Sequence, residues 1–336
     1  MQMDIVDLTA NSSATGVDAH EQFALDVLTG LCSSPKQIPA KYFYDDNGSR
    51  LFQQIMHQEE YYLSRAELAI LDAAQHELPK LVEGENIDII ELGPGDGAKS
   101  RLVISGFLRA GRSVNYYPID ISAKALDLLA NNLPKDRRLS VHGIIADYTQ
   151  GLRYARALSG NRQLVLFLGS NIGNFDTCQS QAFLRSVWAS LAAHDRLIVG
   201  FDLKKDVATL TSAYNDSGGH TRAFNLNLLR RINKELGADF DLNGFQHFGV
   251  YNPVLGAMES YLLSVRVQEV YIAALERSFG FEEFEPLHLE YSFKFLEQDI
   301  ERLCDQIGFG LERNFYDPKH YVVDSLWSVH KNKSLS

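Results

Sequence analysis

The stretch IDIIELGPGDGAKS, residues 87–100, joins an apolar run to a turn with three alternating glycines, and it decides the fold. The apolar run predicts a strand, and the residues after Gly97 predict a helix over about 99–110. A glycine-rich turn between a strand and a helix commonly holds a nucleotide-like cofactor. By itself the turn leaves two cofactor classes open, a phosphate-bearing dinucleotide and S-adenosylmethionine.

The sequence downstream of this turn repeats the same strand-then-helix rhythm. Strongly apolar segments, each long enough for a strand, alternate with amphipathic helical segments; the strands are expected at 87–92, 114–121, 141–148, 163–170 and 196–203. Continuous apolar strands separated by such helices are typical of a parallel sheet that is covered on both faces. The sequence therefore predicts an α/β fold with a doubly wound, Rossmann-like sheet.

The rhythm changes after residue 203, which predicts a second structural region. Residues 206–240 have helical spacing, and strand-like stretches follow until a helix at 297–309 and two closing strands. We expect these two strands to complete the sheet as an antiparallel hairpin. The predicted organisation is a flexible tail at 1–20, a cofactor-binding domain at 21–205 and 291–336, and an inserted α+β lobe at 206–290.

The N-terminal third of the chain is dense in aromatic residues. A turn at DDNGS precedes a short helix at 50–57, and a second helix is predicted after Ser64 with Glu67 completing a capping box. Packing against a core explains most of the aromatic side chains. The alternative is an aromatic wall of a ligand pocket, and it concerns Tyr42, Phe43, Tyr44, Phe52, Tyr61 and Tyr62.

Composition and charge exclude several functional classes. The chain has 336 residues, is 45% hydrophobic, and carries a net charge of −11, which disfavours a nucleic-acid or anionic-membrane surface. The N-terminus lacks the features of a secretory signal, and no apolar run spans a bilayer. Three widely spaced cysteines without metal-ligand spacing predict buried free thiols and no metal site. We expect a cytoplasmic protein, monomeric by default, that acts on a small molecule.

Acidic residues around the glycine turn favour S-adenosylmethionine over a dinucleotide. The turn reads Gly93-Pro-Gly95-Asp96-Gly97 instead of GxGxxG, and a carboxylate there would repel a pyrophosphate but not a sulfonium. Asp120 ends the next strand, where an acid takes ribose hydroxyls. Asp147 ends the strand after that and can accept a hydrogen bond from an adenine amino group. This pattern is typical of class I methyltransferases, with a dinucleotide-binding or ligand-free Rossmann-like domain as the alternative.

The strand at 163–170 runs into a second glycine-containing turn, GSNIGNF. Asn171 and Asn174 can offer amide donors to a carboxylate or acceptors to an amine. The alternative is a turn held by its own asparagine hydrogen bonds. The residues alone do not separate these two interpretations.

Several segments together resemble one known family. The chain is similar to the histidine-specific Nα-methyltransferases of ergothioneine biosynthesis over roughly residues 36–328. The segments that carry the resemblance are KYFYDDNGSRLFQQI, EEYYLSRAE, ELGPGDGAKSRL, FLGSNIGNF, GFDLKKD, FNLNLLRRINKELGADFD and LEYSFKF. The resemblance implies methyl transfer from S-adenosylmethionine to the α-amine of L-histidine, up to the trimethylated product hercynine, with the amino acid held between two lobes.

The resemblance also implies roles for individual residues. Tyr61 and Asn174 would meet the substrate carboxylate, and Tyr44 and Phe52 would line the amine side. The imidazole would be recognised by Glu290 and Ser292, with Ser260 beside the ring, and Tyr214 and Thr221 would help close the second lobe. The cofactor would be bound by Glu91, Gly93, Gly95, Lys99, Asp120, Asp147 and Tyr148.

One departure from the family pattern bears on the substrate. Where the family generally has a methionine against the substrate ring, this chain reads Met258-Glu259-Ser260. Losing one apolar contact changes binding by roughly 1–3 kcal/mol, enough to alter substrate choice without altering the reaction. The alternatives are therefore the same chemistry on another amino acid or biogenic amine, and, from another class, a non-catalytic S-adenosylmethionine-binding protein. A dehydrogenase is disfavoured by the glycine spacing.

Overall fold

The computed structural model describes residues 3–9, 18–158 and 160–331. These residues form two compact units. The parallel-sheet unit contains residues 3–9, 63–204 and 294–331, and the second unit contains residues 18–62 and 205–293. The chain therefore passes from one unit to the other repeatedly, and each unit is described by itself below.

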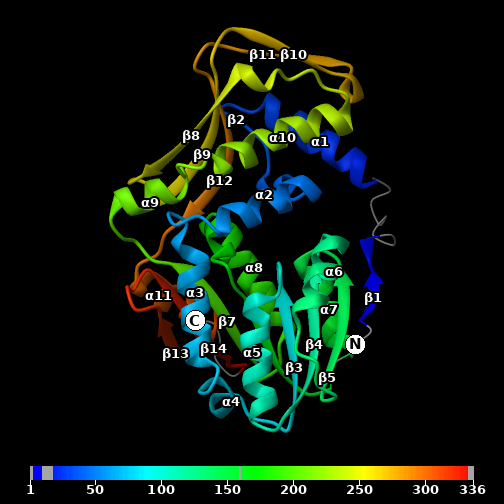
Figure 1. Cartoon of the computed structure of the whole chain (residues 1–336), viewed down its shortest axis with the longest axis vertical. Coiled ribbons are helices and arrows are strands. Elements are labelled where there is room, and N and C mark those ends of the chain that lie inside the picture. The colour runs from blue at the N-terminus through cyan, green and yellow to red at the C-terminus, as the bar shows by residue number, and fades with distance from the viewer. Residues whose placement is uncertain (1–2, 10–17, 159, 332–336) are drawn as a thin grey trace. The chain divides into compact units, whose positions relative to one another are not determined.

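The parallel-sheet unit is built on an eight-stranded sheet in the order β1-β5-β4-β3-β6-β7-β14-β13 (Figure 1). Strands β1 and β3 to β7 run parallel, whereas β14 is antiparallel to β7 and β13 to β14. The strands are β1 (Asp4–Asp7), β3 (Asn86–Leu92), β4 (Ser113–Asp120), β5 (Leu139–Ile145), β6 (Arg162–Phe167), β7 (Arg196–Asp202), β13 (Phe309–Tyr316) and β14 (Val322–Val329). The predicted doubly wound fold with a C-terminal antiparallel hairpin is confirmed.

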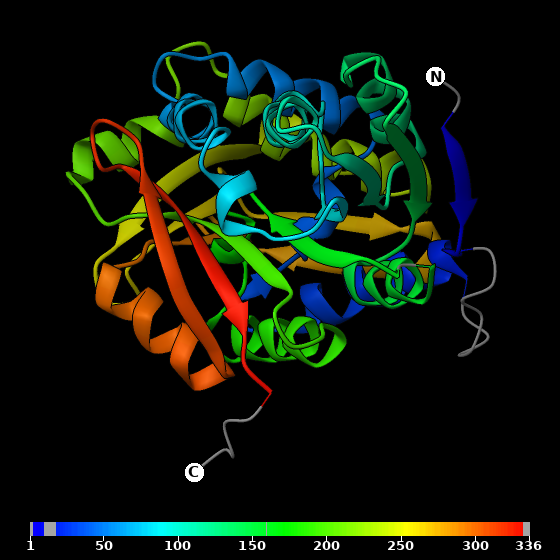
Figure 2. The ribbon, with the colours of Figure 1, turned by 90° about the horizontal axis from the view of Figure 1, so that it is seen from below.

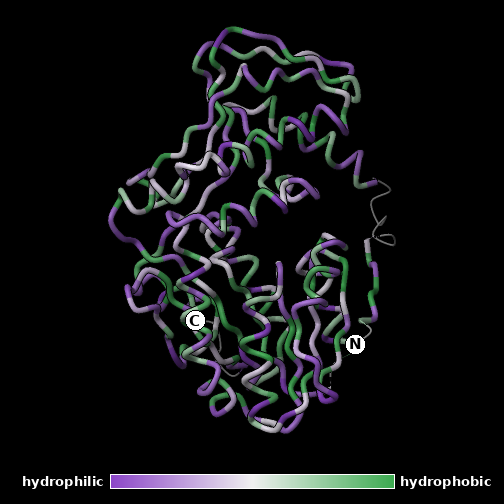
Figure 3. The backbone as a smooth tube through the Cα atoms, viewed as in Figure 1, coloured by the Kyte–Doolittle hydropathy of each residue, from purple (hydrophilic) through white to green (hydrophobic). Residues whose placement is uncertain are grey.

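Helices cover both faces of this sheet, as Figure 2 shows. On one face lie α3 (Tyr62–Ala74), α4 (Leu78–Leu81), α5 (Ala98–Arg109) and α6 (Ala123–Asn132), and on the other α7 (Tyr148–Leu158), α8 (Thr177–Ser190) and α11 (Glu297–Ile307). The central strands are mostly hydrophobic (Figure 3) because both of their faces are buried. The largest fully buried side chain is that of Trp327, on β14.

The order of the strands fixes where a ligand site is expected. From β3 the chain adds β4 and β5 on one side, and then returns to add β6 and β7 on the other side. The strand order therefore reverses between β3 and β6. In open α/β sheets ligands bind outside the carboxyl ends of the strands at such a reversal. The turns that follow Leu92 and Phe167 meet at this point.

The predicted flexible tail at 1–20 is wrong for the residues that the structure describes. Residues Asp4–Asp7 form β1, which pairs in parallel with β5 at the edge of the sheet. All four side chains are exposed, so main-chain hydrogen bonds to β5 are the main contacts of this strand. Its sequence has no alternation of buried and exposed residues from which the strand could be predicted. Helix α1 (Ala19–Cys32) begins after Asp18, whose side chain caps it. Residues 1–2 and 10–17 lie outside the described part of the chain.

The second unit combines a four-stranded sheet, a two-stranded sheet and helices. The four-stranded sheet has the order β2-β12-β9-β8, and β10 pairs with β11. The strands are β2 (Lys36–Gln37), β8 (Phe245–Asn252), β9 (Ala257–Ser264), β10 (Gln268–Ile272), β11 (Arg277–Phe281) and β12 (Pro286–Phe293); the helices are α1, α2 (Asp46–Met56), α9 (Val207–Ala213) and α10 (His220–Leu236), with a 3-10 turn at Ala40–Phe43. The mixed α+β character expected of the inserted lobe is present.

The structure divides the chain differently from the predicted domain boundaries. Residues 21–62 were expected in the cofactor-binding domain, but they pack with 205–293. Phe23 and Phe43 share a hydrophobic core with Leu228 of α10, and Asn47 donates to Asn227 across the same contact. The apolar spacing of a helix shows that it packs, but does not show against which core. The sequence pattern therefore could not place this segment.

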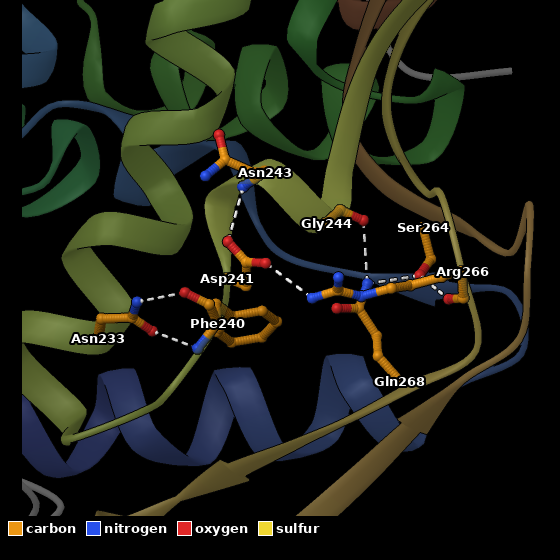
Figure 4. Close-up of polar contacts among 8 residues, drawn as sticks. All are labelled: Asn233, Phe240, Asp241, Asn243, Gly244, Ser264, Arg266 and Gln268. Atoms are coloured by element: carbon orange, nitrogen blue, oxygen red, sulfur yellow. Dashed lines mark hydrogen bonds and ion pairs between the residues drawn. The ribbon is translucent and has the colours of Figure 1, made fainter.

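Polar contacts fix the connection between α10 and the strands of the second unit (Figure 4). The Asn233 side chain donates to the carbonyl of Phe240 at 2.8 Å and accepts from the amide of the same residue at 2.9 Å. Arg266, just after β9, donates to the Asp241 carboxylate at 2.7 Å. Gln268 bonds to the start of β8 and to the end of β9. These contacts set where β8 and β9 begin and end, and therefore their register.

The two chain crossings near residues 204 and 294 are paired within the parallel-sheet unit. The amide of Lys204 donates to the carbonyl of Phe295 at 2.9 Å, and Lys294 forms a salt bridge with Asp202 at 2.8 Å. Both charged side chains are fully buried. Removing one partner of such a pair would leave an uncompensated buried charge. The middle segment of the parallel-sheet unit ends at Lys204, two residues after β7, and the chain enters the second unit at Lys205.

The burial of the cysteines differs from the sequence expectation. All three cysteines are free, but only Cys304 is buried, whereas Cys32 and Cys178 are exposed. The expectation of buried thiols is therefore wrong for these two, which lie at helix ends.

Within residues 3–9, 18–158 and 160–331, no helix has both the length and the apolar character needed to cross a membrane.

Gly97, which precedes α5, supplies a stability prediction. Its φ is +78°, and an added Cβ would lie 2.3 Å from Cδ1 of Leu129. We expect Gly97→Ala to lower the free energy of unfolding by about 1–3 kcal/mol, because a side chain is strained in this conformation and also collides with α6. Urea denaturation measures the change. Gly280→Ala is the control, since an added Cβ there meets no atom within 4 Å, and an equal loss in both variants would contradict the prediction.

Candidate active site

The glycine turn after β3 lies at the strand reversal and leaves open space for a ligand. Gly93 has a φ of +72°, and a Cβ on it would lie 2.8 Å from the hydroxyl of Tyr148. A Cβ on Gly95 would meet no atom within 4 Å. The Asp96 carboxylate accepts from the amide of Ala98 at 3.0 Å and so stabilises the turn itself. The turn can therefore approach a ligand closely through its backbone, which fits the nucleoside of S-adenosylmethionine.

Glu91, predicted to contact the cofactor, lies beneath the turn instead. Its side chain is buried, and its carboxylate accepts hydrogen bonds from Ser100 and Tyr116, each at 2.5 Å. Burial raises its pKa, although the hydrogen bonds from the two hydroxyls oppose the rise. These contacts join β3 to α5 and β4. Glu91 therefore supports the glycine turn from below.

Lys99 stands in the first turn of α5 and is held by an acidic partner. Its Nζ lies 2.6 Å from Oε2 of Glu67. Burial lowers the pKa of Lys99, but the charge and the hydrogen bond of Glu67, together with the nearby acids Glu91 and Asp324, outweigh burial and raise the pKa, so Lys99 is a cation. The predicted capping role of Glu67 is wrong, because α3 begins at Tyr62 and Glu67 lies inside the helix with its side chain turned to Lys99. Sequence spacing alone had no means of revealing this contact.

Asp120 ends β4, one strand away from the glycine turn. Its carboxylate is half-buried and accepts from the amide of Ser122 at 2.9 Å. Burial raises the pKa of Asp120 to about 6, against the lowering effect of the backbone amides of Ser122 and Ile121. An acceptor at this position matches the predicted role toward ribose hydroxyls.

The raised pKa of Asp120 predicts a pH dependence of ligand binding. Below about pH 6 the free protein holds Asp120 neutral, and a neutral carboxyl is a poorer acceptor for two ribose hydroxyls. We expect the Kd of S-adenosylhomocysteine to rise about tenfold from pH 7 to pH 5, as proton binding competes with the ligand. Isothermal titration calorimetry measures it. Asp120→Asn should remove the dependence, and a wild-type Kd that stays flat over this range would contradict the assignment.

Asp147 and Tyr148 follow β5 at the same edge of the sheet. Asp147 is exposed, and its carboxylate accepts from the amide of Gln150 at 2.9 Å, at the start of α7. Tyr148 packs edge-on against Phe167 at 5.6 Å, and burial raises its pKa well above the usual range, so its hydroxyl stays protonated. The sheet therefore brings Asp147 and Tyr148 to the edge that also carries Gly93 and Asp120.

The structure distinguishes the two asparagines in the turn after β6, for which the sequence left two interpretations open. Asn171 donates through its side chain to the carbonyl of Leu168 at 3.0 Å, so it is bound within its own turn. Asn174 ends the short 3-10 helix Asn171–Asn174 and is half-buried. Gly169, with φ of +80°, opens the turn. Of the two amides, that of Asn174 is the better candidate for a ligand contact.

In the second unit, the aromatic candidates form a chain of edge contacts around α10. Phe52 lies 5.6 Å from Tyr44 and 6.1 Å from Tyr61, in both cases edge-on, and 5.8 Å from Phe224. Tyr44, Phe52 and Tyr61 are half-buried, whereas the other three aromatic residues of the segment are buried, namely Tyr42, Phe43 and Tyr62. Core packing therefore accounts for the three buried rings, and the pocket wall stays a prediction for the three half-buried ones.

A β-bulge in β12 brings the three imidazole candidates to one face of the four-stranded sheet. Glu290 pairs with Ser260 and Ser292 with Met258, whereas Leu289 is left without a partner in β9. Side chains directly opposite in neighbouring strands share a face. Glu290 and Ser292 therefore stand on the face of Ser260, which is itself 2% exposed. Strict alternation along β12 would not have predicted this arrangement.

Tyr214 is bonded to Ser292 and is held in place by a second hydrogen bond and by the close approach of β8. Its hydroxyl donates to Oγ of Ser292 at 2.6 Å, and its carbonyl accepts from Nε2 of His247 at 2.9 Å. A Cβ on Gly249 would lie 3.0 Å from the Tyr214 carbonyl, so the close approach of β8 needs glycine there. Thr221 is buried at the start of α10, and its amide donates to Asp216. Tyr214 and Ser292 thus form one preorganised pair.

A cleft of about 810 Å³ lies at the opposite edge of the parallel sheet. It is polar and is lined by residues from the amino ends of β3 and β6 and the end of α7, among them Asn86, Arg156, Asn161, Arg162 and Gln163. Ligands of open α/β sheets bind at the carboxyl ends of the strands. The cleft is therefore separate from the candidate site. Among the residues described, no group of three or more histidine, cysteine or acidic side chains could hold a metal ion.

The strand order, the glycine turn and the row of acids at successive strand ends define the parallel-sheet unit as that of a class I methyltransferase. Comparison of the sequence with known families is specific: a sequence model of the histidine-specific, S-adenosylmethionine-dependent methyltransferases matches residues 23–329. The chain belongs to this family. The resemblance drawn from the sequence is confirmed.

Three relatives show the range of the family. The histidine N-alpha-methyltransferase of Mycobacterium tuberculosis is 35% identical over 287 residues, which cover 85% of this chain and 88% of that protein. The protein of the same name from Mycolicibacterium smegmatis is 33% identical, covering 89% and 92%. The 4-dimethylallyltryptophan N-methyltransferase of Claviceps fusiformis is 26% identical, covering 90% and 91%. Proteins named for two different amino-acid substrates are thus similar in sequence to this chain over most of its length.

Proposed function

We propose that this protein transfers methyl groups from S-adenosylmethionine to the α-amine of L-histidine, up to the trimethylated product. The family match and the similarity to two histidine N-alpha-methyltransferases support the proposal. The structural observation that carries it is the row of Glu290, Ser260 and Ser292 on one sheet face. A carboxylate and hydroxyls together suit an imidazole, which has one N–H donor and one acceptor nitrogen.

The cofactor site fits S-adenosylmethionine in charge and in shape. When bound, S-adenosylmethionine supplies an electrophilic methyl group on a sulfonium. We propose that the backbone at Gly93 and Gly95 approaches the nucleoside, that Asp120 accepts from the ribose, and that Asp147 and Tyr148 contact the adenine. Lys99 is the cation suited to the carboxylate of the methionine part.

The chain needs to supply positioning and desolvation more than a strong base. An α-amine has a pKa near 8, so its deprotonation at pH 7 costs about 1 kcal/mol. Holding the amine in line with the methyl group provides most of the acceleration in such a displacement. We propose that Tyr61 and Asn174 bind the substrate carboxylate and that Tyr44 and Phe52 line the amine side, where half-buried aromatic rings exclude water.

The amine loses its hydrogen-bond donors as methylation proceeds. Each transfer replaces one N–H by an N–CH₃, so the site must retain the intermediates through the carboxylate and the side chain. Glu290 and the bonded pair of Tyr214 and Ser292 are suited to this task because, in the proposed pose, they would contact the end of the substrate that does not change. This argument supports repeated transfer to one substrate.

Ser260 makes another amino acid or amine the alternative acceptor. A methionine at this position would pack against the ring, whereas Ser260 offers a small polar surface next to Glu290. We expect Ser260→Met to favour histidine over other acceptors by roughly 5–100-fold in kcat/KM, the effect of one added apolar contact. Transfer of tritium from labelled S-adenosylmethionine to a panel of amino acids measures the ratio. An unchanged ratio would remove Ser260 from the specificity pocket.

The remaining organisation follows from the family role. We propose that the parallel-sheet unit is the S-adenosylmethionine-binding domain and that the second unit supplies the determinants of the amino-acid side chain. Cytoplasmic location and a monomeric state remain the predictions made from the sequence.

A further inference from the structure

A buried carboxylate connects the two turns that meet at the strand reversal. Glu67, on α3, is 2% exposed. Its Oε1 accepts from the amide of Gly169, which opens the turn after β6, at 2.7 Å, and its Oε2 accepts from Nζ of Lys99 at 2.6 Å. Hydrogen bonds to an ionised group are about twice as strong as neutral ones. One side chain therefore sets the distance between the turn after β6 and the first turn of α5.

The sheet leaves room for this carboxylate at a single glycine. A Cβ on Gly200, in β7, would lie 2.4 Å from Oε1 of Glu67 and 3.1 Å from Oδ1 of Asp324. Asp324 stands opposite Gly200 in β14 and is 1% exposed. The Glu67 carboxylate therefore packs against strands β7 and β14. It fits there because Gly200 has no side chain.

Asp324 is a second buried carboxyl group next to Glu67. Burial raises its pKa well above the usual range, and the nearby Glu67 carboxylate raises it further, while the charge of Lys99 opposes the rise. Burial next to the Glu67 carboxylate therefore favours the neutral form of Asp324. Burial also raises the pKa of Glu91, against the lowering effect of its hydrogen bonds and of the charge of Lys99. Glu67 and Lys99 form the ion pair of this cluster, with Nζ 2.6 Å from Oε2.

We infer that Glu67 is a positioning residue for the cofactor site, acting through Lys99 and the Gly169 amide, with Gly200 and Asp324 as its built-in support. Glu67 orients the Lys99 ammonium toward the carboxylate of the methionine part and keeps the turn after β6 at a fixed distance from the glycine turn. The inference rests on the proposed use of S-adenosylmethionine, but not on the identity of the methyl acceptor.

A double-mutant cycle tests the inference through binding of S-adenosylhomocysteine, measured by calorimetry. We expect Glu67→Gln to weaken binding roughly 10–100-fold in the wild-type background, because the amide group can no longer pair with the Lys99 cation. In a Lys99→Met background the same substitution should change the Kd by less than about threefold, since the Lys99 ammonium is gone and the glutamine oxygen can still accept from the Gly169 amide. Equal losses in both backgrounds would overturn the inference and leave Glu67 a structural residue.

Two further variants keep the test independent of folding. Gly200→Ala displaces the Glu67 carboxylate without removing its charge, so it should reproduce the loss of affinity; unchanged affinity in a folded Gly200→Ala protein would count against the inference. Asp72→Asn, on the exposed side of α3, is the matched control and should bind like wild type. Thermal unfolding followed by circular dichroism confirms that each variant is folded.

The cycle also separates this inference from the proposed function. If histidine is not the acceptor, wild type still binds S-adenosylhomocysteine and the coupling between Glu67 and Lys99 persists. If wild type fails to bind S-adenosylhomocysteine at all, the proposed function fails first, and the positioning role fails with it. Coupling between Glu67 and Lys99 without histidine turnover would support the inference and contradict histidine as the acceptor. Histidine turnover without this coupling would support the proposed function and overturn the inference.

Discussion

Replacing Asp120 by alanine is expected to weaken binding of S-adenosylmethionine by about 100-fold or more. A carboxylate that accepts from ribose hydroxyls makes charge-assisted hydrogen bonds of about 1.5–3 kcal/mol, and alanine leaves those hydroxyls without an acceptor in a half-buried site. Asp120 is the last residue of β4, next to the point where the strand order reverses. It is the one acidic residue of that strand, so no other β4 side chain can replace it as an acceptor. Calorimetry with S-adenosylhomocysteine measures the loss directly.

The control for Asp120→Ala is Asp127→Ala. Asp127 is exposed on α6, the helix that follows β4, so its removal changes the net charge equally without reaching the site. Histidine concentrations that saturate the wild type should not rescue Asp120→Ala. If both variants bound S-adenosylhomocysteine like wild type, Asp120 would not be the ribose acceptor.

Replacing Glu290 by alanine is expected to raise the KM for L-histidine roughly 10–100-fold while leaving the Kd of S-adenosylhomocysteine unchanged. The Glu290 carboxylate lies opposite Ser260 in the second unit, on the face that also carries Ser292. Loss of one hydrogen bond to a charged partner accounts for an effect of this size. Steady-state kinetics with varied histidine, combined with calorimetry for the cofactor product, separate the two ligands.

Glu283→Ala is the matched control for Glu290→Ala. Glu283 lies in the exposed connection between β11 and β12, so its removal tests the effect of charge alone. Equal weakening of histidine and of S-adenosylhomocysteine in Glu290→Ala would contradict the division of roles between the two sets of residues.

The sequence predicts the parallel-sheet unit well because its signals are local. Buried parallel strands are continuous apolar runs, and the helices between them have regular spacing, so both are visible in short windows. The row formed by the glycine turn, Asp120 and Asp147 follows from this, since strand ends in a parallel sheet meet at one edge. Family membership confirms the cofactor class that this row indicated.

Other features could not be predicted because they depend on contacts that are distant in the sequence. The bulge at Leu289 changes which face Glu290 occupies, and no residue pattern in β12 announces it. Glu67 follows Ser64 with the spacing of a capping box, yet its partners lie 32 and 102 residues away. Strand β1 lies at the sheet edge with four exposed side chains and pairs with β5 through its main chain, so its side-chain pattern gives little sign of it.

The most direct test of the proposed function is the product of a reaction with L-histidine and S-adenosylmethionine. Mass spectrometry and NMR of the product should show mono-, di- and trimethylated histidine, with every methyl group on the α-nitrogen and none on the imidazole. Absence of methylated histidine, from a protein that binds S-adenosylhomocysteine and methylates another amine in the panel, would contradict the assignment of histidine as the acceptor.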